Sequence, residues 1–373
     1  MRKTKEQFRE EISRAFYLSE ARTGKTGKTK QYLCEHILRK NTRKTYESQA
    51  LTFAEFLNAE YQVTDFPYIK PGMSEHFIGE MVVKAYHGEM AVSSVKTTIH
   101  ALAKLQDILR HQKDYRIRII NKEKQLGRLR ALNMKRSAFV VSEVKANRIS
   151  ESVAIEMILV FRHGTIVRSK LRDTMADVLE FQLFTGSRIS AVFRLAVEDL
   201  DFATCMVTFR HDKGNKTRTV EVDPDYMQKL QRMVEGKKPG RQVFEMFDRK
   251  GQLSSIENSV KRIERWSHEV AEALGVRGAN THSYRKVFAQ HRYEMYQTLS
   301  KTQLKKRIAK RVREDETGRI GQRISKYGRD MSIEKMAALL TSMDLGHNRL
   351  DVLVWYLNRT EDARFSPSEM VVL

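Results

Sequence analysis

Apolar residues recur at helical spacing through most of this chain, and they change to an alternating pattern in one short region. The alternating segments are Met206–Arg210 and Thr217–Val222, whose β-branched and aromatic residues predict two strands. The segment Asp212–Lys216 between them predicts a tight hairpin turn, and Pro224 closes the hairpin. We therefore expect a mainly α fold with a small antiparallel β-sheet.

The first helical region covers residues 31–115. Leu51, Phe53, Phe56 and Leu57 recur at helical spacing, and a helix from Glu75 to Tyr86 follows two prolines. Ser93 or Ser94 then marks the start of a further helix with an apolar face. That face consists of Val95, Ile99, Leu102, Leu105 and Leu109. These stripes predict a small helical domain, preceded at residues 1–30 by a basic extension that is either solvated or in contact with DNA.

A second domain is expected from residue 150 to residue 373. Helical patterns cover Leu171–Phe184 and then about 225–235, 254–274, 283–298 and 333–343, the last with Ser332 as its cap. Gly186 fits a helix C-terminal cap, so Arg188 should project from a turn between two helices. Lys301–Arg313 carries Leu304, Ile308 and Val312 on one face.

The charge of the chain restricts its partners. The 373 residues have a formal net charge of +22 and a sequence pI of about 9.9, which indicates a polyanionic partner, with nucleic acid as the first candidate and an acidic membrane surface as the alternative. No run approaches the roughly 18 apolar residues of a spanning helix, and the N-terminus lacks a signal peptide core. We therefore expect a cytoplasmic, nucleoid-associated protein. Cys34 and Cys205 form neither a disulfide framework nor a zinc site.

A basic segment joins the two expected domains at residues 116–149. It contains ten Lys or Arg against two Glu, so it is either an exposed linker or a segment that crosses a duplex and neutralises phosphates. We predict DNA contacts for basic residues in this segment and in the hairpin. They are Arg128, Arg130, Lys135, Arg136 and Lys216.

Six residues in the second domain suit phosphoryl transfer, although each alone is more often structural. Arginine forks donate paired hydrogen bonds to phosphate oxygens, histidines move protons near neutral pH, and a lysine can protonate a leaving oxygen. A tyrosine can attack phosphorus if neighbouring cations or a base activate its hydroxyl. The six residues are Arg188, Lys213, His282, Arg285, His347 and Tyr356.

The order and spacing of these six residues resemble the tyrosine recombinases, also called phage-type integrases. The similar motifs are Thr185–Ser190, Lys213–Lys216, His282–Arg285 and Leu345–His347, with Tyr356 nine residues after His347. The resemblance covers residues 150–373 and extends to 31–115 as the family's helical DNA-clamp domain. It implies that Tyr356 is the nucleophile and that the other five residues complete the site.

The resemblance also implies a function. The chain would be a site-specific recombinase or integrase of a phage, plasmid or other mobile element, acting on double-stranded DNA as a homotetramer on two duplexes. It would form a 3′-phosphotyrosyl intermediate, which stores the bond energy, so that no nucleotide cofactor or metal is expected. Accessory DNA-bending proteins are possible partners, and the tail 357–373 is expected to reach a neighbouring subunit.

Several positions depart from the family pattern. Ala191 stands where the family has an acid, so Arg188 must be supported from elsewhere. Asp212 replaces the usual glycine before Lys213, and Lys216 competes for the role of Lys213. The 62 residues from Arg285 to His347 indicate a basic insertion at about 299–330.

Three other interpretations remain open at the level of sequence. A type IB topoisomerase would use the same chemistry without pairing two duplexes. A catalytically impaired, sequence-specific DNA-binding relative would keep the fold without the reaction. A basic scaffold protein would not need the ordered set of motifs.

Overall fold

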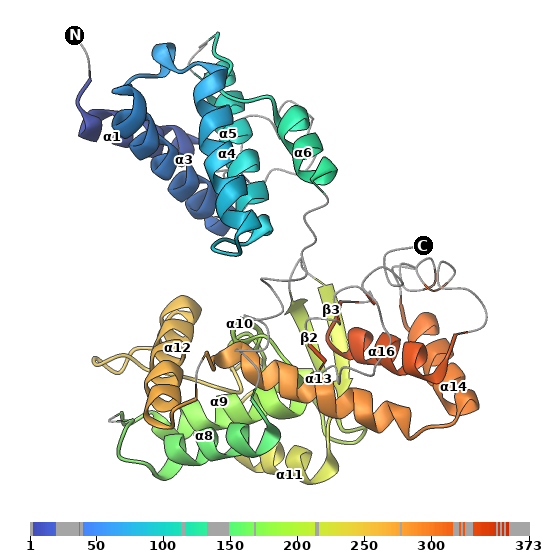
Figure 1. Ribbon diagram of the computed structural model, residues 1–373. Coiled ribbons are helices and arrows are strands. Elements are labelled where there is room, and N and C mark those ends of the chain that lie inside the picture. Colours follow the sequence, from blue (N-terminus) through green and yellow to red (C-terminus); the bar gives the residue numbers. More distant parts are fainter. Residues whose placement is uncertain are drawn as a thin grey trace. The chain divides into compact units, whose positions relative to one another are not determined.

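The structure is a computed structural model (Figure 1). It describes residues 3–19, 37, 40–112, 116–132, 149–167, 169–212, 216–276, 278–315, 321, 324, 331–347, 350, 353 and 356–357. The chain divides into two compact units, Met1–Glu143 and Val144–Leu373. No helix among the described residues is both long enough and apolar enough to span a membrane.

The first unit is a helical domain. Its elements are α1 (Lys5–Leu18), α3 (Lys40–Tyr61), η1 (Phe66–Tyr68), α4 (Pro71–Tyr86), α5 (Val92–Gln112) and α6 (Lys122–Ala131). α3 packs against α1, α4 and α5. The predicted apolar face of α5 is buried from Val95 to Leu109, which confirms that this stripe forms the core.

The structure differs from the sequence prediction at both ends of this unit. Within the segment predicted as a basic extension, α1 buries Phe8, Ile12 and Phe16, which lie four residues apart on one helix face. Within the predicted linker, α6 buries Leu129 and follows the buried Ile119. Both segments therefore belong to the first core, because their few apolar residues share one face while the many charged ones face water.

The second unit is mainly helical with a small antiparallel sheet, as predicted. Its described residues form three strands, of which the sequence predicted the two longer ones. Its elements up to the sheet are α8 (Glu151–His163), α9 (Arg172–Thr185), α10 (Ile189–Val192), η2 (Val197–Asp199), β1 (Leu200–Asp201), β2 (Met206–Asp212) and β3 (Lys216–Glu221). They are followed by α11 (Pro224–Met233), α12 (Ile256–Ala273), α13 (Thr281–Gln297), α14 (Lys301–Arg313) and α16 (Ile333–Asp344). The antiparallel order is β1-β2-β3, with Val207 opposite Val220.

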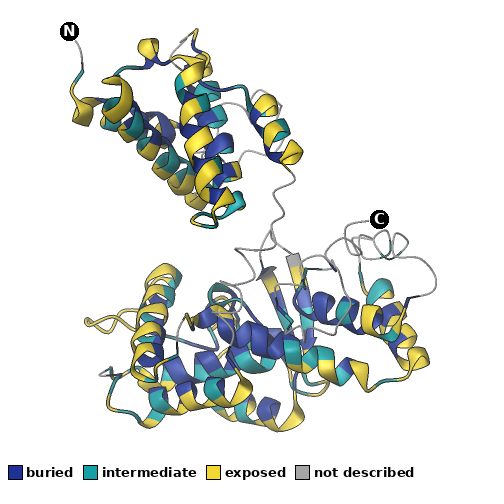
Figure 2. Ribbon diagram, viewed as in Figure 1, coloured by how far each residue is buried: buried dark blue, intermediate teal, exposed yellow. Residues whose placement is uncertain are grey.

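α13 is the central helix of the second unit. It packs against α8, α9 and α16, and its first half is buried on nearly all sides (Figure 2). Asn280 caps its N-terminus by accepting a hydrogen bond from the backbone N–H of His282. This capping fixes the start of the helix and therefore the positions of His282 and Arg285, which lie on its first turn.

The predicted insertion begins with a packed helix. α14 buries Leu304 and Ile308 in a small core with α16, and Arg311 donates a hydrogen bond of 2.8 Å to the buried carboxylate of Asp344. Arg311 also donates to the backbone carbonyl of Thr219 on the edge strand β3. α14 therefore supports the end of α16; most of the insertion after residue 315 lies outside the described residues.

Gly186 should be essential for the stability of the second unit. Its φ is +57°, and an added Cβ would lie 2.2 Å from a ring carbon of Phe288. Gly186→Ala should therefore cost about 1–2 kcal/mol for the left-handed backbone and about 1–3 kcal/mol for overpacking. Urea unfolding followed by tryptophan fluorescence measures this loss, because both tryptophans, Trp266 and Trp355, belong to the second unit.

Gly275→Ala is the matched control for this measurement. Gly275 has a φ of +67°, but an added Cβ would meet no atom within 4 Å. The free energy of unfolding of Gly275→Ala should fall only by the cost of the left-handed backbone, about 1–2 kcal/mol. Equal losses for the two variants would show that the contact with Phe288 is not tight.

Candidate active site

Two turns and one helix of the second unit bring the predicted site residues together. Arg188 follows the left-handed glycine that ends α9, and His347 follows Gly346, whose φ is +69°, just after α16. Arg285 extends from the first turn of α13. Arg188 Nη2 lies 3.2 Å and Arg285 Nη2 lies 3.3 Å from His347 Nε2. The two guanidinium groups therefore converge on one imidazole nitrogen.

Tyr356 completes this cluster. Its hydroxyl oxygen lies 3.5 Å from His347 Nε2, and its ring centre lies 5.1 Å from the His347 ring and 5.3 Å from the His282 ring. The guanidinium of Arg285 lies 5.6 Å from the centre of the tyrosine ring. Tyr356 is 7% exposed, so it is a core residue and a member of the cluster at the same time.

Arg285 is fully buried, and its hydrogen bonds explain how the core accepts it. It donates to the backbone carbonyls of Gly186 and, at 2.6 Å, Leu345. These carbonyls lie in the two turns that carry Arg188 and His347. The same guanidinium therefore contacts both turns and faces Tyr356.

The structure brings together five of the six predicted residues, and the sixth, Lys213, lies outside the described residues. Among the predicted DNA contacts, Lys135 and Arg136 also lie outside them, and for Lys216 the structure describes only the backbone at the start of β3. Arg128 and Arg130 lie exposed in the last turn of α6, where Arg128 Nη1 is 3.4 Å from a carboxylate oxygen of Glu75.

Sequence reasoning missed two charged residues of the site. Asp212 Oδ1 accepts a hydrogen bond from Arg188 Nη1, so the support that Ala191 does not offer comes from β2. Arg218 on β3 is buried and donates to Asp212 Oδ2 at 3.3 Å. The sequence did mark Asp212 as unusual, because it stands where the family has a glycine. Nothing in the sequence marked Arg218, because a polar residue in an alternating strand is ordinarily exposed.

The electrostatics of the cluster keep its histidines neutral. Burial, followed by the nearby cations Arg285 and Arg188, lowers the pKa of His347 to about 2. Desolvation first, and then Arg285 and Lys286, also lowers the pKa of the more exposed His282. A neutral His347 whose Nε2 faces two arginine donors offers a lone pair there, so it can accept a hydrogen bond from the Tyr356 hydroxyl.

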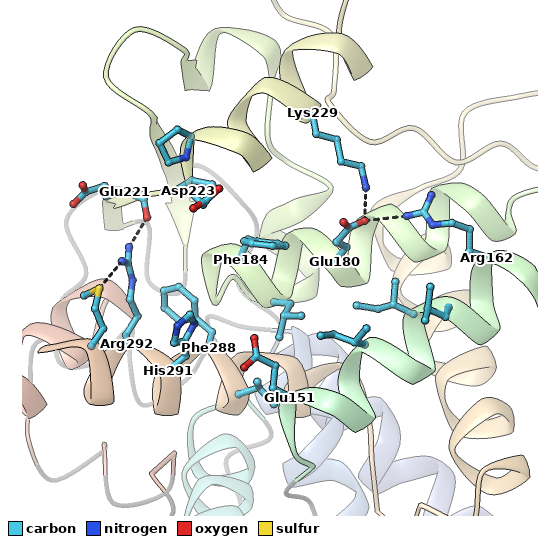
Figure 3. Close-up of a pocket in the computed structure, with 18 residues that line it drawn as sticks. Glu151, Arg162, Glu180, Phe184, Glu221, Asp223, Lys229, Phe288, His291 and Arg292 are labelled. Carbon is cyan, nitrogen blue, oxygen red and sulfur yellow. Dashed lines mark hydrogen bonds and ion pairs between the residues drawn. The ribbon is translucent and has the colours of Figure 1, made fainter. Parts of the chain in front are cut away.

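The described part of the chain offers no metal-binding group, and a cavity of the second unit lies apart from this cluster. Among the described residues, no group of three or more His, Cys, Asp or Glu side chains is placed to hold a metal ion. A cavity of about 600 Å³ lies between α8, α9, α11 and α13, and none of the five clustered residues lines it. In Figure 3 Glu180 lies between Arg162 and Lys229 at one side of this cavity, with Arg292 at the other.

Comparisons with known proteins concern one domain of the chain and its fold. Residues 131–303 match the model of the phage integrase family. No curated protein matches the chain.

Solved structures of recombinases share its fold. The XerH site-specific recombinase bound to difH substrate in a pre-cleavage complex has 15% identity and a TM-score of 0.54, covering 100% of this chain and 97% of that chain. Its post-cleavage complex with palindromic difH substrate has 16% identity and a TM-score of 0.53, covering 95% and 93%.

A transposon integrase gives a similar result. The Tn1549 integrase in complex with transposon right end DNA has 13% identity and a TM-score of 0.50, covering 97% of this chain and 99% of that chain. At these identities the likeness establishes the fold. Residues 131–303 therefore resemble the phage integrase family, and the chain shares its fold with these recombinases.

Proposed function

We propose that this chain is a site-specific DNA recombinase that cleaves and rejoins DNA strands through a 3′-phosphotyrosyl intermediate. The observation that carries the proposal is the convergence of Arg188, Arg285 and the Tyr356 hydroxyl on Nε2 of His347, within 3.2–3.5 Å. A tyrosine nucleophile, a proton acceptor and two phosphate-binding forks are the groups that such a reaction requires.

The cleavage step follows from these positions. Arg188 and Arg285 bind the two non-bridging oxygens of the scissile phosphate and stabilise the charge that accumulates there. Tyr356 Oη forms a bond to phosphorus as its proton passes to His347 Nε2, which the negative charge of the bound phosphate makes more basic than in the free protein. The bond from phosphorus to the 5′-oxygen breaks, and that oxygen leaves as a hydroxyl after protonation by Lys213 or Lys216. Rejoining is the same step in reverse, with a 5′-hydroxyl of the partner strand as the nucleophile.

The proposed substrate is double-stranded DNA, bound by a homotetramer on two duplexes. The formal net charge of +22 supports binding to a polyanion. The XerH and Tn1549 structures that share the fold are complexes with their own recombination DNA, which supports the same class of partner for this chain. Integration or excision of a mobile element is the corresponding role, with accessory DNA-bending proteins as further partners.

Replacing the nucleophile should abolish covalent chemistry and leave binding intact. Tyr356→Phe removes only a hydroxyl, so the packing of this buried ring should be kept. The probe is a nicked duplex whose sequence is selected from a random pool by binding to the wild-type protein. In EDTA and without ATP, the wild type should form an adduct through a 3′-phosphate that peptide mapping locates on Tyr356, and the variant should form none.

Tyr226→Phe is the matched control, because Tyr226 is a buried tyrosine of the same unit that stacks on Phe184, away from the cluster. It should form the adduct at the wild-type rate. An adduct on another tyrosine, or one that persists in Tyr356→Phe, would overturn the assignment. An adduct that forms only with magnesium would exclude the mechanism.

Arg188→Lys should separate binding from catalysis. Lysine keeps the charge but loses the planar fork that binds two oxygens at once. We expect the dissociation constant for the selected duplex to change little and the single-turnover cleavage rate to fall by roughly 10²–10³. Arg210→Lys is the control, since Arg210 lies on β2 in the same unit and pairs with Asp199 of η2. Equal rates for Arg188→Lys and the wild type would remove Arg188 from the site.

The neutral His347 should give the free protein a characteristic acid sensitivity. Above pH 6.5 folded and unfolded chains both hold a neutral imidazole, but below it only the unfolded chain takes up the proton. The free energy of unfolding without DNA should therefore fall as pH drops from 6.5 towards 4, by up to about 1.4 kcal/mol per pH unit from this residue. His347→Gln should flatten this dependence in urea titrations, and an unchanged slope would mean that the folded protein protonates His347.

A further inference from the structure

Arg218 is a third guanidinium at the site, and it faces the protein. Its side chain is 4% exposed and lies over the ring of Phe209 at 4.3 Å. Nη1 donates to the backbone carbonyl of Thr185 at 3.2 Å and to the backbone carbonyl of Asp344. Nε donates to Asp212 Oδ2. Nη1 and Nε of this buried charge are thus taken up by protein groups, and among the described residues Nη2 has no hydrogen-bond partner.

The two carbonyls that Arg218 contacts have a common position in the fold. Thr185 is the last residue of α9, immediately before the turn that carries Arg188, and Asp344 is the last residue of α16, immediately before the turn that carries His347. The last carbonyls of a helix lack intrahelical donors and carry partial negative charge, so a cation is favourable there. One guanidinium therefore joins the ends of both helices.

Asp212 connects this arrangement to the substrate-facing arginine. Its two carboxylate oxygens are divided between Arg188 Nη1 and Arg218 Nε, and its side chain is 4% exposed. Nη2 of Arg188 is directed at His347. The position one turn after Arg188 is the buried Ala191, so α10 supplies no acid there. The orientation of the Arg188 fork therefore depends on Asp212.

Gly346 shows how closely Arg218 packs against the turn that carries His347. An added Cβ at Gly346 would lie 2.9 Å from Arg218 Cδ and 3.4 Å from Asp212 Oδ2. A side chain at this position would push the turn away from the pair. The turn that carries His347 thus leaves little room for a side chain between itself and the pair.

We propose that Asp212 and Arg218 form a positioning pair, which sets Arg188 and His347 at the spacing that the scissile phosphate requires without touching DNA. The proposal rests on the proposed function and extends it to two residues of the β2–β3 hairpin. Its alternative is a pair that only stabilises the fold. The two differ in what a substitution changes: a positioning pair affects the rate of the bound complex through Arg188, and a structural pair affects stability alone.

The first measurement uses Asp212→Asn and Arg218→Lys with the selected nicked duplex. Asparagine keeps the shape of aspartate without its charge. Lysine keeps the charge of arginine without the rigid planar fork that holds the donors of Arg218 in place. We expect the single-turnover cleavage rate at saturating DNA to fall ten- to a hundredfold, with a dissociation constant within threefold of wild type. Asp199→Asn is the matched control, because Asp199 is also a buried acid that accepts from an arginine of β2, Arg210, at 2.5 Å. It should lower the unfolding midpoint and leave the cleavage rate unchanged.

The second measurement is a double-mutant cycle between Asp212→Asn and Arg188→Lys. If Asp212 acts through Arg188, the double variant should cleave about as slowly as Arg188→Lys alone, since the group to be positioned is already lost. If the rate loss of the double variant is the product of the two single losses, Asp212 acts independently and the proposal is overturned. Cleavage by Asp212→Asn at the wild-type rate would also overturn it. If Asp212→Asn does not fold, the same cycle is run with Arg218→Lys.

The covalent adduct separates this proposal from the proposed function. If the wild type forms the adduct on Tyr356 and Asp212→Asn forms it equally fast, only the positioning pair is wrong. If the wild type forms no adduct on any nicked duplex that it binds, the proposed function is wrong, and the positioning pair is overturned with it.

Discussion

The second unit is built around a positive charge in its interior, the guanidinium of Arg285. Removing such an ion from water costs several kcal/mol, and it persists only where hydrogen bonds and charges compensate it. Here the compensation comes from the carbonyls of Gly186 and Leu345, from the imidazole nitrogen of His347 and from the ring of Tyr356. The turns after α9 and α16 must therefore approach α13 closely, and these are the turns that carry the remaining catalytic candidates.

Other buried charges lie around Arg285 and also need compensation. Arg188, Arg218 and Arg285 lie close together, and in this cluster Asp212 is the carboxylate shared by two of them. Burial and the neighbouring cations lower the pKa of Arg218, which reflects the cost of gathering like charges in one place. A bound phosphate would offset this repulsion. The gathered positive charges thus lower the stability of the free protein, and they suit the site to a bound anion.

The chain also supports this cluster from behind. Asp344 ends α16, where a negative side chain is unfavourable against the helix dipole. It is buried and accepts hydrogen bonds from Tyr296 at 2.7 Å and from Arg311 at 2.8 Å. α14, the helix that begins the insertion, supplies Arg311 and so helps to fix the residue that precedes the turn of His347.

The sequence by itself determined the local structure and the chemical character of the site. Periodicity predicted most of the helices, except α1 and α6, and both long strands. Gly186 and Ser332 marked helix ends, and the spaced motifs predicted five residues that the structure brings together. Tertiary structure alone decided that α1 and α6 belong to the first core, that Arg218 joins the ends of two helices, and that Asp212 connects Arg218 to Arg188. The reason is physical: capping and periodicity act over a few residues and leave a local pattern. A buried ion pair between residues 188 and 212, or a carbonyl contact between 218 and 344, forms only when distant segments pack.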